Sequence, residues 1–192
     1  AYGRANSTYE VDVTSGTVEK IVVLNAGGLR LKSELEGGTA LDSDKVNYTI
    51  YSSEVDEFGQ RKLVLSSAPE GLIIRLNSGT YYVVSQYGDA NAIVRADVQI
   101  KPGQLTEATV SHRAAFITFK LVNQVGGEAL AGTSWSVLSP EGEVIVESVG
   151  AFPSYVLAAG PYSVLARNGG KSYNREFHVV PGRDQEVEVV TQ

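Results

Sequence analysis

Apolar and polar residues alternate along several short stretches of this chain, and glycine, proline and acidic residues separate these stretches. In residues 46–51 the alternation places Tyr48 and Ile50 on one face, and in residues 134–138 it does the same for Trp135 and Val137. A period of two is typical of β-strands that bury one face. The pattern therefore predicts a strand at each place, with the single tryptophan in a core.

The order of these features repeats along the chain. Tyr2-Gly3-Arg4-Ala5-Asn6 reappears as Tyr87-Gly88-Asp89-Ala90-Asn91, and a looser third version begins at Arg167. A spacing of about 85 residues suits a small β-sandwich and is too long for a solenoid repeat. We expect the C-terminal strands of a truncated repeat at 1–27, a first complete β-sandwich at 28–113 and a second at 114–192.

Turn residues divide each complete copy into roughly seven strands at turn spacings of about 8 to 12 residues. The last two predicted strands of each copy are joined by Pro102-Gly103 or Pro181-Gly182. Proline fixes φ at the first turn position and glycine frees the next, which is typical of a type II turn. The predicted fold class is all-β, with two tandem Greek-key, Ig-like sandwiches preceded by a leftover hairpin.

That leftover hairpin covers residues 7–24 and lacks the sheet to which its strands would belong. A lone two-stranded hairpin is marginal in water. We expect it to be disordered, docked on the first complete copy, or paired with another molecule, and pairing through its edge would give a dimer.

Composition narrows the classes of partner. The formal charge of -6 and the pI near 5.0 leave no basic stripe for nucleic acid. The sequence contains no run of about 18 apolar residues, so it does not predict membrane insertion. The chain has no cysteine, hence no disulfide or thiolate chemistry, and no methionine, so we interpret it as a fragment of a longer product.

Sequence patterns of known reaction centres are missing. His112 and His178 are the two histidines, and they stand too far apart for a local metal-binding pair. Neither a G-x-S-x-G elbow nor a glycine-rich phosphate loop occurs. We therefore predict no enzyme activity and no cofactor.

Two groups of side chains remain as candidate binding residues. Carboxylates on turns of the first complete copy are weak candidates for Ca²⁺, although solvated turn residues would look the same; they are Asp42, Asp44, Glu54, Asp56 and Glu57. Tyrosines of the same copy are candidates for an aromatic platform that stacks on sugar rings, although cross-strand tyrosine pairs also stabilise sheets without a ligand; they are Tyr51, Tyr82 and Tyr87.

The motif frame of residues 29–192 resembles the prealbumin-like sandwich domains, which include collagen-adhesin B-type stalk domains and carboxypeptidase regulatory-like domains. This frame consists of an opening strand, a short turn with Ala-Leu, an alternating strand with an aromatic residue, the motif L-x-x-G-x-Y and a late Pro-Gly hairpin. It is also similar to tandem repeats of large exported bacterial proteins. The resemblance implies a place in the cell envelope, periplasmic or at the cell surface.

In many stalk domains the resemblance also implies an isopeptide bond between lysine and asparagine beside a buried acid. Lys32 and Lys120 lie near the expected place of the lysine. The strand after L-x-x-G-x-Y ends without a carboxylate, and the final strands offer no asparagine. We therefore predict that this chain forms no isopeptide bond.

Taken from the sequence, the predicted function is that of a non-enzymatic spacer or protein-interaction arm of an exported bacterial protein. The alternative is a carbohydrate-binding module that uses exposed tyrosines, with calcium as an added ligand. The expected partner is a protein or a cell-surface polymer.

Overall fold

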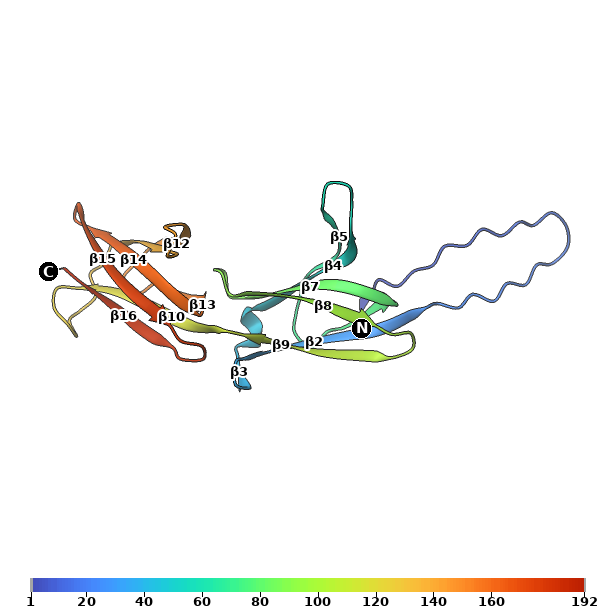
Figure 1. The fold of residues 1–192 in the computed structure, drawn as a ribbon, viewed down its shortest axis with the longest axis horizontal. Coiled ribbons are helices and arrows are strands. Elements are labelled where there is room, and N and C mark those ends of the chain that lie inside the picture. Colours follow the sequence, from blue (N-terminus) through green and yellow to red (C-terminus); the bar gives the residue numbers. More distant parts are fainter. Residues whose placement is uncertain (1, 192) are drawn as a thin grey trace. The chain divides into compact units, whose positions relative to one another are not determined.

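A computed structural model of the protein describes residues 2–191 (Figure 1). Strands dominate it, and a short 3-10 helix, η1, spans Ser43–Lys45. The first strands are β1 (Tyr2–Gly3), β2 (Ala26–Leu35), β3 (Thr39–Ala40), β4 (Val46–Val55), β5 (Arg61–Ala68), β6 (Ile73–Asn77), β7 (Gly79–Tyr87), β8 (Ile93–Ile100) and β9 (Leu105–His112). The others are β10 (Ala114–Val122), β11 (Ser134–Leu138), β12 (Val144–Val149), β13 (Ser154–Ala158), β14 (Gly160–Asn168), β15 (Lys171–Val179) and β16 (Gln185–Val190). The predicted all-β class is confirmed.

The strands of the first complete copy form two sheets, one of which also includes β1 from the segment before it. One sheet has the order β5-β4-β7-β8, and the other has the order β1-β6-β2-β3, with β9 also paired to β2. Alternation along β4 buries Tyr48 and Ile50 completely, as predicted. On the opposing sheet Leu29 and Ile74 are likewise almost without exposed surface, so the apolar faces of strands that are far apart in sequence make the core.

The strands of the second complete copy repeat this plan. One sheet has the order β12-β11-β14-β15 and the other β13-β10-β16. The first and last strands of the copy, β10 and β16, run parallel, whereas β10 and β13 run antiparallel. A chain that returns to its first strand in this way encloses its apolar faces between two sheets.

Trp135 lies in the core of this second copy, as the alternation predicts. Its side chain is 2% exposed, and its indole N–H donates to the Gly150 carbonyl at 2.8 Å. The Phe119 ring lies between two aromatic neighbours, with its centroid 5.8 Å from that of Trp135 and 5.4 Å from that of Phe177. The polar edge of the tryptophan is thus satisfied while its rings are fully packed.

The chain folds into two compact units. The first unit comprises Ala1–Lys32, Asn47–Ser85 and Arg95–Val110, and the second comprises Ser33–Val46, Gln86–Val94 and Ser111–Gln192. Segments of the first complete copy therefore belong to the unit that holds the second copy. The domain boundaries at 27/28 and 113/114 stay a prediction from the repeat.

Residues 4–25 form a long loop between β1 and β2 and contain no strand (Figure 1). Two extended arms flank a bend at residues 14–16. The arms touch through side chains: Tyr9 Oη lies 3.5 Å from the Val23 carbonyl oxygen and Lys20 Nζ donates to the Glu10 carbonyl at 3.0 Å. Every residue of the predicted hairpin at 7–24 is exposed, so it does not dock on the first unit in this structure.

Candidate functional site

An aromatic surface lies on the first unit, where β4, β5 and β7 are neighbours. The centroids of the Tyr51 and Tyr82 rings are 6.4 Å apart, with the ring planes tilted by 55°. The guanidinium carbon of Arg61 lies 4.4 Å from the centroid of the Tyr82 ring. We call Tyr51, Arg61 and Tyr82 the tyrosine pair surface. The Arg61 guanidinium thus makes a cation–π contact with the Tyr82 ring, and both tyrosines are half-buried.

Tyr87 does not belong to this surface. Its side chain is 7% exposed, and its ring meets the His112 ring edge-on at a centroid distance of 5.8 Å. Burial raises the pKa of the Tyr87 hydroxyl. The sequence held the signal for this difference, because Tyr82 and Tyr87 are five residues apart and a strand sends such residues to opposite faces. Of the three candidate tyrosines, the structure brings two together.

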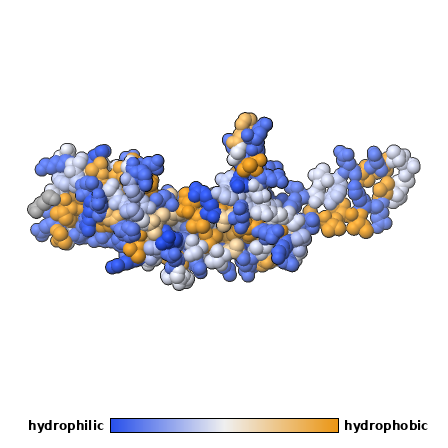
Figure 2. Space-filling view, viewed as in Figure 1, coloured by the Kyte–Doolittle hydropathy of each residue, from blue (hydrophilic) through white to orange (hydrophobic). Residues whose placement is uncertain are grey.

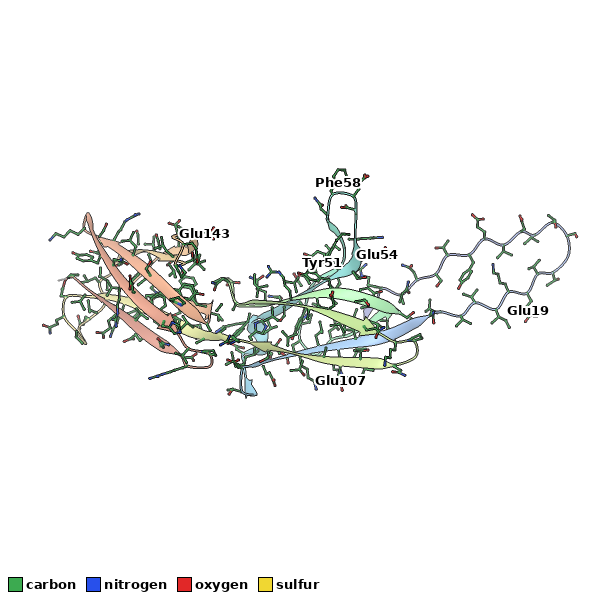
Figure 3. All side chains as sticks on the ribbon, in the orientation of Figure 1. Glu19, Tyr51, Glu54, Phe58, Glu107 and Glu143 are labelled. Carbon is green, nitrogen blue, oxygen red and sulfur yellow. The ribbon has the colours of Figure 1, made fainter. Side chains whose placement is uncertain are left out.

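The turn between β4 and β5 carries an exposed phenylalanine that was not among the predicted binding residues. We call residues 55–60 the hairpin tip, and Figure 2 shows apolar side chains at the end of this hairpin. Phe58 is 79% exposed and Val55 is 56% exposed. Figure 3 labels Phe58 at the end of this hairpin. The signal was an aromatic residue inside an acidic turn, where solubility alone favours polar side chains.

The hairpin tip is ordered by its own hydrogen bonds. Asp56 Oδ1 accepts from the backbone N–H groups of Phe58 at 2.9 Å and of Gln60 at 2.8 Å. The Asp56 N–H donates to the Gln60 carbonyl at 2.9 Å, and Gly59 adopts φ +75°, which favours glycine. The turn thus holds Phe58 in a fixed place before any partner arrives.

Of the candidate carboxylates, Asp42 and Asp56 accept backbone hydrogen bonds within their own turns. Asp42 Oδ1 accepts from the Asp44 N–H at 3.3 Å, and Asp42 Oδ2 lies 3.3 Å from Lys45 Nζ. Glu54 and Glu57 are exposed. Within residues 2–191, no group of three or more acidic or histidine side chains could hold a metal ion. The Ca²⁺ assignment stays a prediction without a ligand cluster in this part of the chain.

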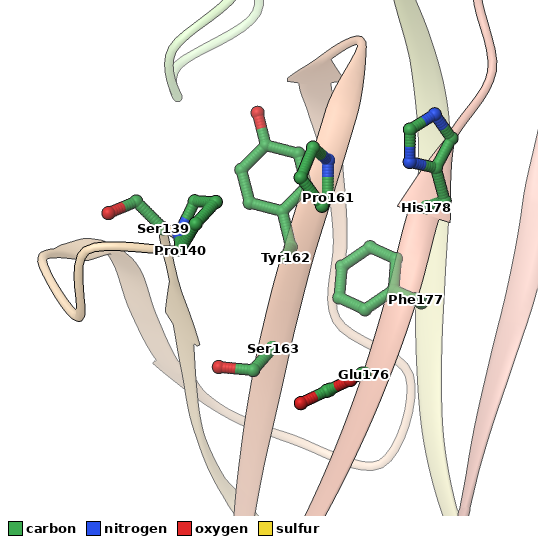
Figure 4. A pocket seen from close by; sticks show the side chains of 8 residues that line it. All are labelled: Ser139, Pro140, Pro161, Tyr162, Ser163, Glu176, Phe177 and His178. Carbon is green, nitrogen blue, oxygen red and sulfur yellow. The ribbon is translucent and has the colours of Figure 1, made fainter.

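A pocket of about 540 Å³ opens on the second unit (Figure 4). Its floor is the stacked pair of Tyr162 and Phe177, whose centroids are 5.7 Å apart. Ser139 caps a turn by accepting from the N–H groups of Glu141 and Glu143 at 3.2 and 3.3 Å. Among the described residues, no hydrogen bond connects Ser139 with His178, which also lines the pocket.

Lys32 in β2 and Lys120 in β10, the first strand of each complete copy, form ion pairs. Lys120 Nζ lies 2.8 Å from Glu186 Oε1 and 2.8 Å from Glu188 Oε1. The hydrogen bonds that Lys120 donates to these carboxylates raise the pKa of Lys120, and the bond to Glu188 lowers the pKa of Glu188. Lys32 Nζ lies 3.8 Å from Glu107. The sequence did not reveal these partners, because which strands pair is decided by the fold, and the absence of an isopeptide bond stays a prediction.

In residues 2–191, no helix is long and apolar enough to cross a membrane.

Comparison with known proteins gives a match to a family model and matches to several solved structures. No curated protein matches the sequence. The Bacillus anthracis TIE protein is 12% identical with a TM-score of 0.34, and the match covers 88% of this chain and 33% of that one. The Streptococcal ancillary pilin is 17% identical with a TM-score of 0.35, covering 95% and 69%. GBS52, the minor pilin of Streptococcus agalactiae, is 11% identical with a TM-score of 0.38, covering 86% and 95%.

The chain thus spans about a third of the length of the TIE protein. Its second copy has a clearer sequence relation. Residues 116–191 match the family model described as the Rhizobiales growth-associated tandem repeat domain.

Proposed function

We propose that this chain is a non-enzymatic spacer and protein-interaction arm of an exported bacterial protein, periplasmic or at the cell surface. Tandem sandwiches provide a scaffold, and the match of the second copy to a bacterial tandem repeat domain supports this class of protein. The observation that carries the interaction role is the hairpin tip, where Phe58 is 79% exposed.

Phe58 has the properties of a binding anchor. A large aromatic ring that is buried at an interface contributes much of the binding free energy, and a preformed turn lowers the entropy lost on binding. Glu54, Asp56 and Glu57 surround it with acidic groups, so the fitting partner is a protein with an apolar pocket and a basic rim.

The test is the binding of the fluorescently labelled chain to cell envelope fractions of a Rhizobiales bacterium. We expect Phe58→Ala to weaken saturable binding by about tenfold or more. Phe152→Ala is the matched control, because Phe152 is 59% exposed on a loop of the second unit. Equal loss in both variants, or no loss in either, would contradict a role of the hairpin tip.

A second candidate function is carbohydrate binding, which the tyrosine pair surface favours. The Tyr51 and Tyr82 rings lie next to each other and are partly exposed, and aromatic faces stack on sugar rings. In a native gel that contains soluble polysaccharide, this function requires retardation that Tyr82→Ala removes and Tyr9→Ala, on the loop at residues 4–25, preserves. Addition of EDTA tests whether calcium takes part.

We also propose that two copies of this chain form a dimer, in which residues 7–24 of one copy pair with the same residues of the other. The arms of this loop expose apolar side chains, among them Val13 at 66%, Ile21 at 86% and Val23 at 71%. Extended segments with open backbone groups pair readily with another chain. Sedimentation velocity would show a dimer at micromolar concentration that the double variant I21D/V23D shifts to monomer; a monomeric parent chain would sink the proposal.

A further inference from the structure

The motif Tyr-Gly-x-x-Asn makes a short loop with defined contacts in each unit. In the first unit, β1 contains the Tyr-Gly of the motif and pairs in parallel with β6, with Gly3 opposite Arg75. The next residue, Arg4, donates its N–H to the Arg75 carbonyl at 2.8 Å. At the end of the motif, the N–H of Asn6 donates to Asn77 Oδ1 at 3.1 Å, and Asn77 Nδ2 donates to the Asn6 carbonyl at 3.0 Å.

In the second unit, the motif Tyr87-Gly88-Asp89-Ala90-Asn91 contacts β13. A Cβ atom on Gly88 would lie only 2.7 Å from Val156 Cβ, so the backbone of the motif runs directly against the strand. Asn91 Oδ1 accepts from the Ala158 N–H at 3.0 Å, and Asn91 Nδ2 donates to Tyr162 Oη at 2.9 Å. Both hydrogen-bonding ends of this amide are therefore used.

The two receiving strands occupy the same place in their copies. β6 precedes Gly79 and Tyr81, and β13 precedes Gly160 and Tyr162, which are the Gly and Tyr of the L-x-x-G-x-Y motif. Gly3 lies opposite Arg75 and Gly88 packs against Val156, and both partners stand four residues before the glycine of L-x-x-G-x-Y. Asn6 bonds to Asn77 and Asn91 bonds to Ala158, and both partners stand two residues before that glycine. The same loop thus contacts the same register twice.

We propose that Tyr-Gly-x-x-Asn is a docking loop that recognises the strand before the L-x-x-G-x-Y turn in the following copy of the repeat. Backbone proximity at the glycine and hydrogen bonds at the asparagine position supply the recognition, through the backbone of Asn6 in the first unit and through the side chain of Asn91 in the second. In the second unit the glycine is required twice over, since Gly88 has φ +71° and Val156 fills the space of a Cβ. In the first unit the contact at Gly3 is more open, because a Cβ added there would have no other atom within 4 Å.

The second complete copy lacks a docking loop of this kind among its described residues. Between β14 and β15 the chain turns tightly at Gly169 and Gly170, with Asn168 opposite Lys171. Asn168 Nδ2 donates instead to the Ala131 carbonyl at 2.9 Å and to Thr133 Oγ1 at 3.0 Å. This copy therefore has a receiving strand but no loop to offer, and the recognition has a direction along the chain.

Amide hydrogen exchange in the full chain, followed by NMR, tests the proposal. Asn91→Ala removes the acceptor of the Ala158 N–H, and we expect the exchange of that amide to accelerate about tenfold while the amide of Val164 in the core of β14 keeps its rate. Asn174→Ala on exposed β15 is the matched control and should change neither rate.

Two further variants separate docking from a general loss of stability. Asn91→Asp keeps an oxygen acceptor for Ala158 and loses the donor to Tyr162, so the protection of Ala158 should survive. Gly88→Ala should accelerate the exchange of Ala158 as Asn91→Ala does, because its Cβ would collide with Val156. The proposal is overturned if Asn91→Ala leaves the exchange of Ala158 unchanged, or if all amides of β13 and β14 accelerate together.

Discussion

The burial of His112 predicts that the stability of the fold depends on pH. Its side chain is 1% exposed, and burial lowers its pKa from the ordinary value of 6.5. As the pH falls below about 6.5, the unfolded chain binds a proton that the folded chain takes up only at lower pH, so the free energy of unfolding decreases. We expect urea midpoints to fall between pH 7 and pH 5, and the fall to be smaller in His112→Gln.

The control for this prediction is His178→Gln, since His178 is exposed on β15. Carboxylates that titrate in the same range affect all variants alike, so the difference in slope isolates His112. Identical slopes in the parent chain and in His112→Gln would contradict the assignment.

Other single residues differ in how far the sequence predicts their surroundings. Trp135 lies in the core because a period of two places it on the same buried face as Val137, and the pattern predicted this directly. The burial of Tyr87 could have been predicted by following the alternation along the strand from Tyr82, which lies on the opposite face. Phe58 could not be assigned from the pattern, because exposure of an aromatic residue in a turn depends on how far the hairpin extends beyond its sheet.

At the scale of strands and turns, the sequence predicted which segments are extended better than it predicted their partners. The sequence predicts a hairpin of two strands in residues 7–24, yet the structure has no strand there. A ladder of backbone hydrogen bonds requires a neighbouring strand, and these two arms contact each other through side chains. The parallel pairing of β10 with β16 was likewise beyond the pattern, since alternation fixes the face of a strand and not its neighbour.

The start of β2 depends on a glycine with no space for a side chain. A Cβ on Gly27 would lie 2.3 Å from the Lys101 carbonyl oxygen and 2.8 Å from Ile100 Cγ2. Because the nearest atom belongs to the backbone, Gly27→Ala should lower the free energy of unfolding by about 1–3 kcal/mol. Chemical denaturation of the purified variant measures this loss.

Gly150→Ala provides the comparison, because nothing lies within 4 Å of its Cβ position and its φ is not in the left-handed region. It should change stability by less than about 0.5 kcal/mol. If both variants unfold at the parent midpoint, the close approach of β2 to the β8–β9 turn is not present in solution.

For the whole molecule, the repeat in the sequence was the most informative feature, since it predicted two copies of one all-β fold and the structure shows two sets of paired sheets. Function could be predicted only as a class, because interaction surfaces consist of exposed residues whose use depends on a partner that no pattern names. The candidate tyrosines and carboxylates were chosen by chemistry, and the fold separated them into a surface pair, a core residue and turn residues.

The intact mass of the chain tests the predicted absence of isopeptide bonds. Lys120 has two carboxylate neighbours at 2.8 Å and keeps its charge in these ion pairs. We expect mass spectrometry of the unfolded chain to give the mass calculated from the sequence. A mass lower by one ammonia would reveal a bond between lysine and an amide side chain; a tryptic digest would then show whether Lys32 or Lys120 forms it.

The parallel pairing of β10 with β16 determines how the second copy responds to tension. The register joins Ile117 with Gln185 at one end and Val122 with Val190 at the other. A pull on the start of β10 and the end of β16 would act along the strands, so the hydrogen bonds between them would be loaded in shear, together, and not opened one after another. Tension applied at these two ends would therefore have to break the bonds between β10 and β16 as a group.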